Sequence, residues 1–234
     1  MRALLLAAGL GTRLRPITNT VPKCLVPIHG KPLLGYWLDM LLGGGRIERV
    51  LVNLHYFPDT VRQFVASSPW RDQVELVHEE NLLGTGGTVL ANANYFSGQA
   101  FMTVHADNLS RFDVGAFIDR HAVRPTGCVM TMMTFATDQP QSSGIVELDE
   151  KGIVRAFHEK VAHPPGNLAN GAVYIFEPAI VEFCRSLGKP VIDISTEILP
   201  RFIGRIFTFQ NDCYHRDIGT PDSLSAAERE YPER

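Results

Sequence analysis

The sequence lacks the closely spaced cysteine pairs that would indicate a disulfide framework or a zinc site. Its 4 cysteines, at positions 24, 128, 184 and 213, lie far apart. It also lacks an excess of positive charge, with a formal net charge of −3, and any apolar run long enough to span a membrane. We therefore expect a cytoplasmic protein with no nucleic-acid or membrane partner.

The length and hydrophobic content are those of one α/β domain. The chain has 234 residues, of which 45% are hydrophobic, enough for a substantial core. In the first half, short apolar segments typical of strands alternate with amphipathic segments typical of helices. The predicted strands are residues 4–8, 49–55, 74–79 and 101–104, and the predicted helices are residues 32–42, 58–66 and 88–93. This alternation predicts a doubly wound, mainly parallel, Rossmann-like sheet, in which ligands bind at the carboxyl ends of strands.

After His121 the pattern changes from alternation to successive strands. The predicted strands here are residues 128–135, 145–148, 154–158 and 172–176. We therefore predict an inserted mixed-strand half in a single domain that covers residues 1–234, with the halves meeting near residue 122.

The stretch from Leu4 to Pro27 combines a buried strand with glycines and cations. Gly9 and Gly11 allow backbone conformations that bring N–H groups close to an anion. Arg13 is suited to bidentate contact with a phosphate, and Lys23 adds a compact positive charge. This arrangement predicts a phosphate-binding loop after the first strand.

Three other interpretations of the N-terminal region fit less well. A secretory signal needs a small-residue cleavage site, whereas the apolar run ends in Gly11-Thr12-Arg13. A dinucleotide-binding fingerprint needs a third glycine where Leu14 stands. A P-loop at Gly30-Lys31 needs Ser or Thr where Pro32 stands.

The sugar-phosphate nucleotidyltransferases, also called NDP-sugar pyrophosphorylases, are the family that this loop resembles. The resemblance rests on the motif Gly9-x-Gly11-Thr12-Arg13-Leu14-x-Pro16-x-Thr18, followed by Pro22-Lys23. Later motifs extend it to about Asp222, and it is greatest to the short mannose 1-phosphate and manno-heptose 1-phosphate guanylyltransferases. Many members continue into a left-handed parallel β-helix, which we do not expect here.

The resemblance implies a set of nucleotide-binding residues. In that family the glycine loop and its Arg hold a nucleoside triphosphate, and the Lys contacts its phosphates. The residues at these positions are Leu6, Ala8, Gly9, Gly11, Thr12, Arg13 and Lys23. The run from Leu83 to Gly87 is similar to the family's base and ribose contact, which adds Gly84, Thr85 and Gly87. Taken alone, this run fits a plain glycine turn with Thr85 as a helix N-cap equally well.

Two aspartates are candidate metal ligands. Asp107 follows a buried strand, where a carboxylate needs a partner, and beside a triphosphate that partner would be Mg²⁺. A helix-capping role fits Asp113 better than Asp107. By resemblance Asp217 is the second metal carboxylate; its alternative role as a turn residue is less suitable, because Thr220 or Asp222 would serve the start of the next helix better.

The sugar-phosphate subsite is implied by three weaker fragments, residues 143–147, 157–160 and 167–174. By resemblance Gly144 offers backbone hydrogen bonds to the sugar, Glu159 and Asn170 bind its hydroxyls, and Lys160 binds its phosphate, with Asp107 also in this subsite. Without the flanking motifs, an exposed strand-end pair is the better interpretation of Glu159 and Lys160.

The activity implied by the resemblance is transfer of a nucleotidyl group from a nucleoside triphosphate to a sugar 1-phosphate. GTP and a manno-configured sugar, either mannose or D-glycero-D-manno-heptose, are the favoured substrates, and the product would serve nucleotide-sugar and polysaccharide biosynthesis. The catalytic residues would be Arg13, Lys23, Asp107 and Asp217. We allow for a homodimer. The alternatives are a uridylyl- or thymidylyltransferase and, more remotely, a non-catalytic regulatory protein that binds nucleotide sugars, which would have no need of metal carboxylates.

Overall fold

The computed structural model describes residues 1–232, which form two compact units. The first unit combines residues 1–82 and 104–114 with the segment from residue 213 onward. The second unit combines residues 83–103 with residues 115–212. The proposed single domain, with halves that meet near residue 122, stays a prediction.

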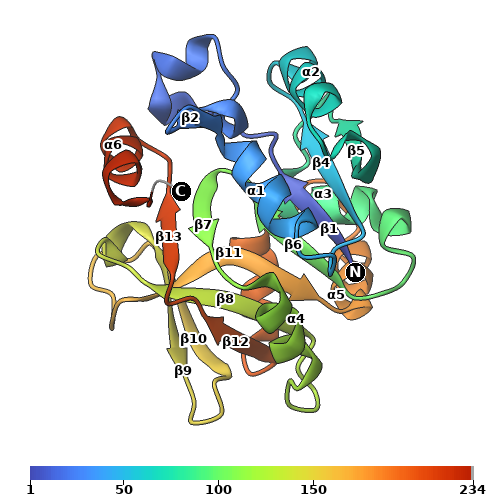
Figure 1. Ribbon diagram of the computed structural model, residues 1–234. Coiled ribbons are helices and arrows are strands. Elements are labelled where there is room, and N and C mark those ends of the chain that lie inside the picture. The colour runs from blue at the N-terminus through green and yellow to red at the C-terminus, as the bar shows by residue number, and fades with distance from the viewer. Residues whose placement is uncertain (233–234) are drawn as a thin grey trace. The chain divides into compact units, whose positions relative to one another are not determined.

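The first unit is built on three parallel strands, β1 (Arg2–Leu6), β4 (Arg49–Leu54) and β5 (Val74–His78). Figure 1 shows β4 and β5 side by side in cyan and green tones. The helices α1 (Leu33–Leu42) and α2 (Pro58–Ser67) connect them in sequence. The strands and helices predicted for this part of the chain are therefore confirmed, and most of their apolar residues are buried, although β5 buries only Val74.

The first unit also contains short strands that the sequence analysis did not predict. The strand β2 (Pro27–Ile28) pairs with β3 (Lys31–Pro32). After β6 (Phe101–His105), the strand β7 (Asn108–Arg111) pairs antiparallel with β13 (Tyr214–Asp217), and α6 (Pro221–Glu230) follows β13. Thr220, one of the two residues considered for this helix start from the sequence, caps α6 through a capping box with Ser223.

The second unit has a mixed sheet. The strand β8 (Met130–Ala136) pairs antiparallel with β11 (Leu168–Phe176) and parallel with β12 (Ile206–Gln210). The strand β9 (Gly144–Leu148) pairs antiparallel with both β11 and β10 (Val154–Glu159). Its helices are α3 (Gly84–Ala91), α4 (Val114–Ala122) and α5 (Pro178–Ser186). The fold class is thus confirmed as mixed α/β, with a Rossmann-like parallel part and a mixed-strand part. Within residues 1–232, no helix has both the length and the apolar character needed to cross a bilayer.

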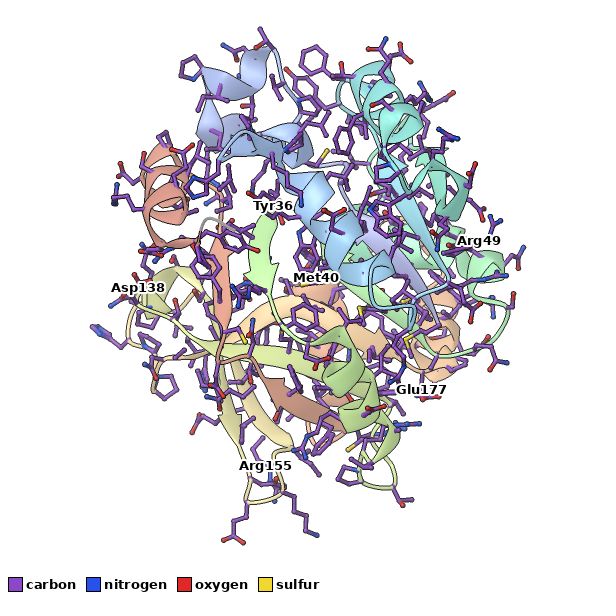
Figure 2. The ribbon with its side chains drawn as sticks, in the orientation of Figure 1. Tyr36, Met40, Arg49, Asp138, Arg155 and Glu177 are labelled. Atoms are coloured by element: carbon purple, nitrogen blue, oxygen red, sulfur yellow. The ribbon has the colours of Figure 1, made fainter. Side chains whose placement is uncertain are left out.

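The second unit contains a partly buried polar cluster. Glu177 is labelled in Figure 2. Its Oε1 atom forms an ion pair with Arg124 Nη2 at 2.5 Å and lies 3.0 Å from His121 Nε2. His121 Nδ1 also lies 2.7 Å from Thr131 Oγ1. Burial lowers the pKa of His121, and the hydrogen bond to Glu177 offsets this only in part.

We expect the protein to lose stability through His121 as the pH falls from 7 to 5. The folded-state pKa of His121 lies below the unfolded value of about 6.5, so in this range the unfolded state binds more protons. The free energy of unfolding therefore falls as the pH drops below about 6.5. His121→Gln should weaken this pH dependence in urea unfolding, whereas His163→Gln, at an exposed site, should leave it unchanged. Equal pH slopes for the two variants would contradict the assignment.

Candidate active site

The turn after β1 is held by contacts within the first unit. Gly11 has a φ of 62°, which favours glycine, and a Cβ there would lie 2.9 Å from Thr18 Cγ2. Thr18 Oγ1 donates a hydrogen bond of 2.7 Å to Gly11 O. The Ala7 N–H donates to Asn53 Oδ1 at 2.7 Å, so a buried side chain of β4 fixes the backbone where the turn begins. The turn is therefore preformed.

The predicted nucleotide-binding residues of this turn differ in their exposure. Leu6 and Ala8 are buried, whereas the sites open to solvent are Gly9, Thr12 and Arg13. The structure thus places glycine backbone and a guanidinium at the surface, supported by apolar residues of β1. This is the arrangement that a phosphate-binding turn requires.

Four charged candidates meet at this turn. Lys23 Nζ lies 2.8 Å from Asp107 Oδ2 and 3.5 Å from Asp217 Oδ1. The Lys23 side chain is only 6% exposed, so its ammonium is held where it stands. Arg13 Nη2 lies 3.8 Å from Asp217 Oδ2. The structure therefore brings together all four residues to which the sequence analysis gave catalytic roles.

The β7–β13 pair explains how two aspartates so far apart in sequence become neighbours. Asp217 is the last residue of β13 and stands opposite Asn108, which directly follows Asp107. The Ile218 N–H also donates to Asp107 O at 3.3 Å. Gly219 follows closely, and a Cβ at this position would lie 2.8 Å from both Arg13 Nη2 and Asp217 Oδ2. The glycine thus leaves room for the Arg13 and Asp217 side chains to meet.

The electrostatics of the cluster keep Asp107 ionised. Burial by itself would raise the pKa of Asp107, but the Lys23 ammonium and, to a smaller extent, His105 hold that pKa below its usual range. Burial also lowers the pKa of the nearby His215, to about 3, so its imidazole is neutral at physiological pH. The cluster thus presents carboxylates, balanced by Lys23 and Arg13.

The residues present fit a divalent cation. Oxygens of Asp107 and Asp217 already converge on one cationic atom, Lys23 Nζ, so the two carboxylates point to a common region. Within residues 1–232, no group of three or more His, Cys, Asp or Glu side chains is placed to hold a metal. Two carboxylates suit Mg²⁺, because this ion commonly takes one or two carboxylates and completes its shell with phosphate oxygens and water.

The glycine-rich loop at the start of α3 has a role that the sequence analysis missed. A Cβ at Gly87 would lie 2.2 Å from Pro190 O, and one at Gly84 would lie 2.5 Å from Ile192 O. The N–H groups of Gly86 and Gly87 both donate to Ile192 O, at 2.8 and 3.1 Å. These glycines therefore allow close packing against residues 190–192, whatever ligand the loop also contacts. Thr85 is not the N-cap of α3, which begins at Gly84.

Gly87→Ala should destabilise the protein despite the helical advantage of alanine. The added methyl group overlaps a backbone carbonyl that cannot rotate away, so we expect a loss of roughly 1–3 kcal/mol in the free energy of unfolding. Chemical denaturation would measure this loss. Gly166→Ala is the matched control, because a Cβ there meets nothing within 4 Å. Equal stability of the two variants would show that residues 190–192 move aside easily.

Four of the predicted sugar-side residues form a cluster in the second unit, whereas the fifth, Asp107, belongs to the first unit. Glu159 stands opposite Gly144 in the β9–β10 pair, and a Cβ at Gly144 would lie 2.7 Å from Glu159 Oε2. Lys160 Nζ lies 3.4 Å from Glu159 Oε1, and its backbone has a φ of 50°, which is uncommon for a residue other than glycine. Asn170 Nδ2 donates to Tyr174 Oη at 2.7 Å. Tyr174 is a member of this cluster that the sequence analysis treated only as part of a fragment.

A preformed glycine turn thus lies next to two carboxylates and two cations on an α/β frame. The chain belongs to the nucleotidyl transferase family, whose model matches residues 2–234. This membership confirms the family suggested by the motifs.

The relatives that are similar to this chain differ from one another in the nucleotide and the sugar that their names specify. It is 32% identical over 227 residues to a mannose-1-phosphate guanylyltransferase of Mycobacterium tuberculosis, covering 95% of this chain and 62% of the relative. It is 36% identical over 190 residues to a glucose-1-phosphate thymidylyltransferase of Streptomyces griseus, covering 78% of this chain and 51% of the relative. The chain thus spans only half to about three fifths of these proteins. The crystal structure of HddC from Yersinia pseudotuberculosis matches with a TM-score of 0.82 at 26% identity, over 99% of both chains.

Proposed function

We propose that the protein transfers a nucleotidyl group from a nucleoside triphosphate to a sugar 1-phosphate, giving a nucleotide-diphospho-sugar and pyrophosphate. The convergence of Asp107 and Asp217 on Lys23 beside the glycine turn is the observation that carries this proposal. A protein that only bound nucleotide sugars would not need two carboxylates there. Family membership supports the same reaction class.

In the proposed reaction, an oxygen of the sugar phosphate attacks the α-phosphorus, and pyrophosphate leaves. The attacking group is already an anion, so we assign no protein nucleophile and no general base. Arg13, Lys23 and Lys160 offset the repulsion between the anions and hold them in line. When a divalent cation such as Mg²⁺ is bound by Asp107 and Asp217, it supplies Lewis-acid stabilisation at the α-phosphate.

GTP and a manno-configured sugar 1-phosphate, from mannose or D-glycero-D-manno-heptose, are the substrates that we propose. The mannose-1-phosphate guanylyltransferase relative and the match to HddC, which has also been solved complexed with GMP-PN, support this choice. The thymidylyltransferase of Streptomyces griseus and a UTP–glucose-1-phosphate uridylyltransferase of Synechocystis support the alternative of another base.

A pyrophosphate-release assay tests the proposal. The protein is incubated with Mg²⁺, each of five nucleoside triphosphates and a panel of sugar 1-phosphates. Release that is greatest with GTP and a manno-configured sugar is the expected result, and greater release with UTP or dTTP would move the assignment to the alternative. Binding of nucleotide sugar without pyrophosphate release in any combination would instead establish a regulatory protein.

A further inference from the structure

The turn that carries Asp107 is held by two backbone hydrogen bonds. Ala106 and Asp107 lie between β6 and β7 rather than within either strand. The Ala106 N–H donates at 3.1 Å to the carbonyl oxygen of Leu6, the last residue of β1, and Asp107 O accepts from the Ile218 N–H at 3.3 Å. The backbone that presents the proposed metal ligand is therefore tied to β1 and to the residue after β13.

A third hydrogen bond to this stretch comes from a side chain. Trp37, in α1, donates from Nε1 at 2.8 Å to the carbonyl oxygen of Asn108, which directly follows Asp107. Trp37 is only 1% exposed, and its ring packs in a T-shaped arrangement against Phe112, with 6.3 Å between the ring centroids. A hydrogen bond in such a dry environment is strengthened, and the loss of its donor is costly. Helix α1 thus holds the residue next to the proposed metal ligand.

Core packing accounts for a large apolar side chain at position 37 but not for the direction of its N–H group. Trp37 lies in the apolar stripe of α1 with Leu34 and Leu38, which are both buried. A phenylalanine or a leucine would fill such a stripe without a polar atom that needs a partner. The other tryptophan, Trp70, is half-buried and donates to Asp39 Oδ1 at 2.7 Å, so it holds a side chain outside the proposed site.

We propose that Trp37 is a positioning residue for Asp107. Its N–H group fixes Asn108 and, through the backbone, holds the Asp107 carboxylate where it and Asp217 can bind a divalent cation. This inference rests on the proposed function and adds to it a residue of the core. Mg²⁺ accepts ligands only at about 2.0–2.1 Å and in near-octahedral geometry, so a small displacement of one carboxylate weakens its binding. Replacing a residue that orients a metal ligand without touching the metal commonly costs about tenfold to a hundredfold in metal affinity or activity.

Replacing Trp37 with β-(3-benzothienyl)alanine tests the N–H group alone, because sulfur takes the place of that group in a ring of nearly the same shape. We expect the Mg²⁺ concentration for half-maximal pyrophosphate release to rise by about tenfold. Amide hydrogen exchange of the metal-free protein, followed by NMR, is the second readout. The Ala106 and Ile218 amides should exchange about fivefold faster or more, the effect of losing one hydrogen bond that holds the turn. The Ala7 amide, which donates to Asn53, should exchange at an unchanged rate.

The same replacement at Trp70 is the matched control, because it also removes one indole N–H bond within the first unit. It should change neither the Mg²⁺ dependence nor the exchange of the Ala106 and Ile218 amides. Trp37→Phe should repeat the effect of the sulfur-containing residue, whereas 5-fluorotryptophan at position 37, which keeps the N–H group, should give the values of the unsubstituted protein.

Two results would overturn the inference while leaving the proposed function intact. One is an unchanged Mg²⁺ dependence in both variants that lack the donor at position 37, and the other is unchanged exchange of the Ala106 and Ile218 amides in those variants. If the unsubstituted protein released no pyrophosphate with any pair of substrates, the proposed function itself would fail, whatever the variants at Trp37 showed.

Discussion

Asp107→Asn should lower kcat by about two orders of magnitude or more, a loss of at least about 2.7 kcal/mol in transition-state stabilisation. The amide keeps the shape of the side chain but removes the charge that would hold a divalent cation. Folding should persist, because Lys23 retains its second carboxylate partner, Asp217, at 3.5 Å. Steady-state kinetics over a range of Mg²⁺ concentrations, together with thermal unfolding, would measure both effects.

Asp217→Asn should act in the same direction, because its carboxylate converges on the same ammonium. Asp212→Asn is a suitable control, since Asp212 is exposed and its carboxylate accepts only from Gln210 at 2.8 Å among residues 1–232. Normal turnover by both Asp107→Asn and Asp217→Asn at limiting Mg²⁺ would show that these carboxylates do not bind the metal. Their role would then be to hold Lys23.

Lys23→Ala and Lys160→Ala should each lower kcat/KM by about tenfold to a hundredfold, since a hydrogen bond to a charged group is worth roughly 1.5–3 kcal/mol. The two losses should differ in kind. Lys23 is buried between two carboxylates, so its removal weakens the triphosphate site and lowers kcat, because charge on the departing pyrophosphate grows toward the transition state. Lys160 is 65% exposed, and its removal should mainly raise the KM for the sugar phosphate.

Kinetics with each substrate varied in turn would distinguish these outcomes. Lys151→Ala, in the exposed hairpin between β9 and β10, is the control for loss of a surface lysine. Should Lys160→Ala raise only the KM for the nucleotide, the assignment of residues 144–174 to the sugar phosphate would be wrong. Should Lys23→Ala change only the KM for the sugar phosphate, Lys23 would not act on the triphosphate.

The elements that the sequence predicted are those with strong apolar periodicity. The strands β1 and β4 and the helix α1 bury apolar runs such as Leu4–Leu6, and the local pattern was sufficient to predict them, as it was for β5 and α2. The strands β7 and β13 were missed because each has four residues, several of them polar, and each gains its partner from about a hundred residues away. The helix α5 was also missed. The sequence did offer signals for it, because Pro178 suits a helix start and Val181 and Cys184, which the structure buries, are apolar residues at helical spacing.

In the candidate site, too, local sequence motifs predicted the residues involved but not which distant residues would lie next to each other. Motifs identified which residues carry charge, but no local pattern indicates that Lys23 lies between Asp107 and Asp217. The glycines near residue 86 suggested a ligand, whereas their closest contact is the distant segment 190–192. Asn53 gave a signal that could have been used, because an asparagine within an apolar strand usually needs a backbone partner, which here is Ala7.

The pairing of β7 with β13 has a consequence for how the protein matures. The first compact unit is assembled from three stretches of chain, and the last of these carries Asp217. A chain emerging from the ribosome would present Asp107 long before its counterpart, so the carboxylate pair could form only after synthesis had passed residue 217. Closing such a long loop is entropically costly and slow compared with local helix formation. The cluster that we hold responsible for chemistry should therefore be among the last parts of the molecule to acquire native structure.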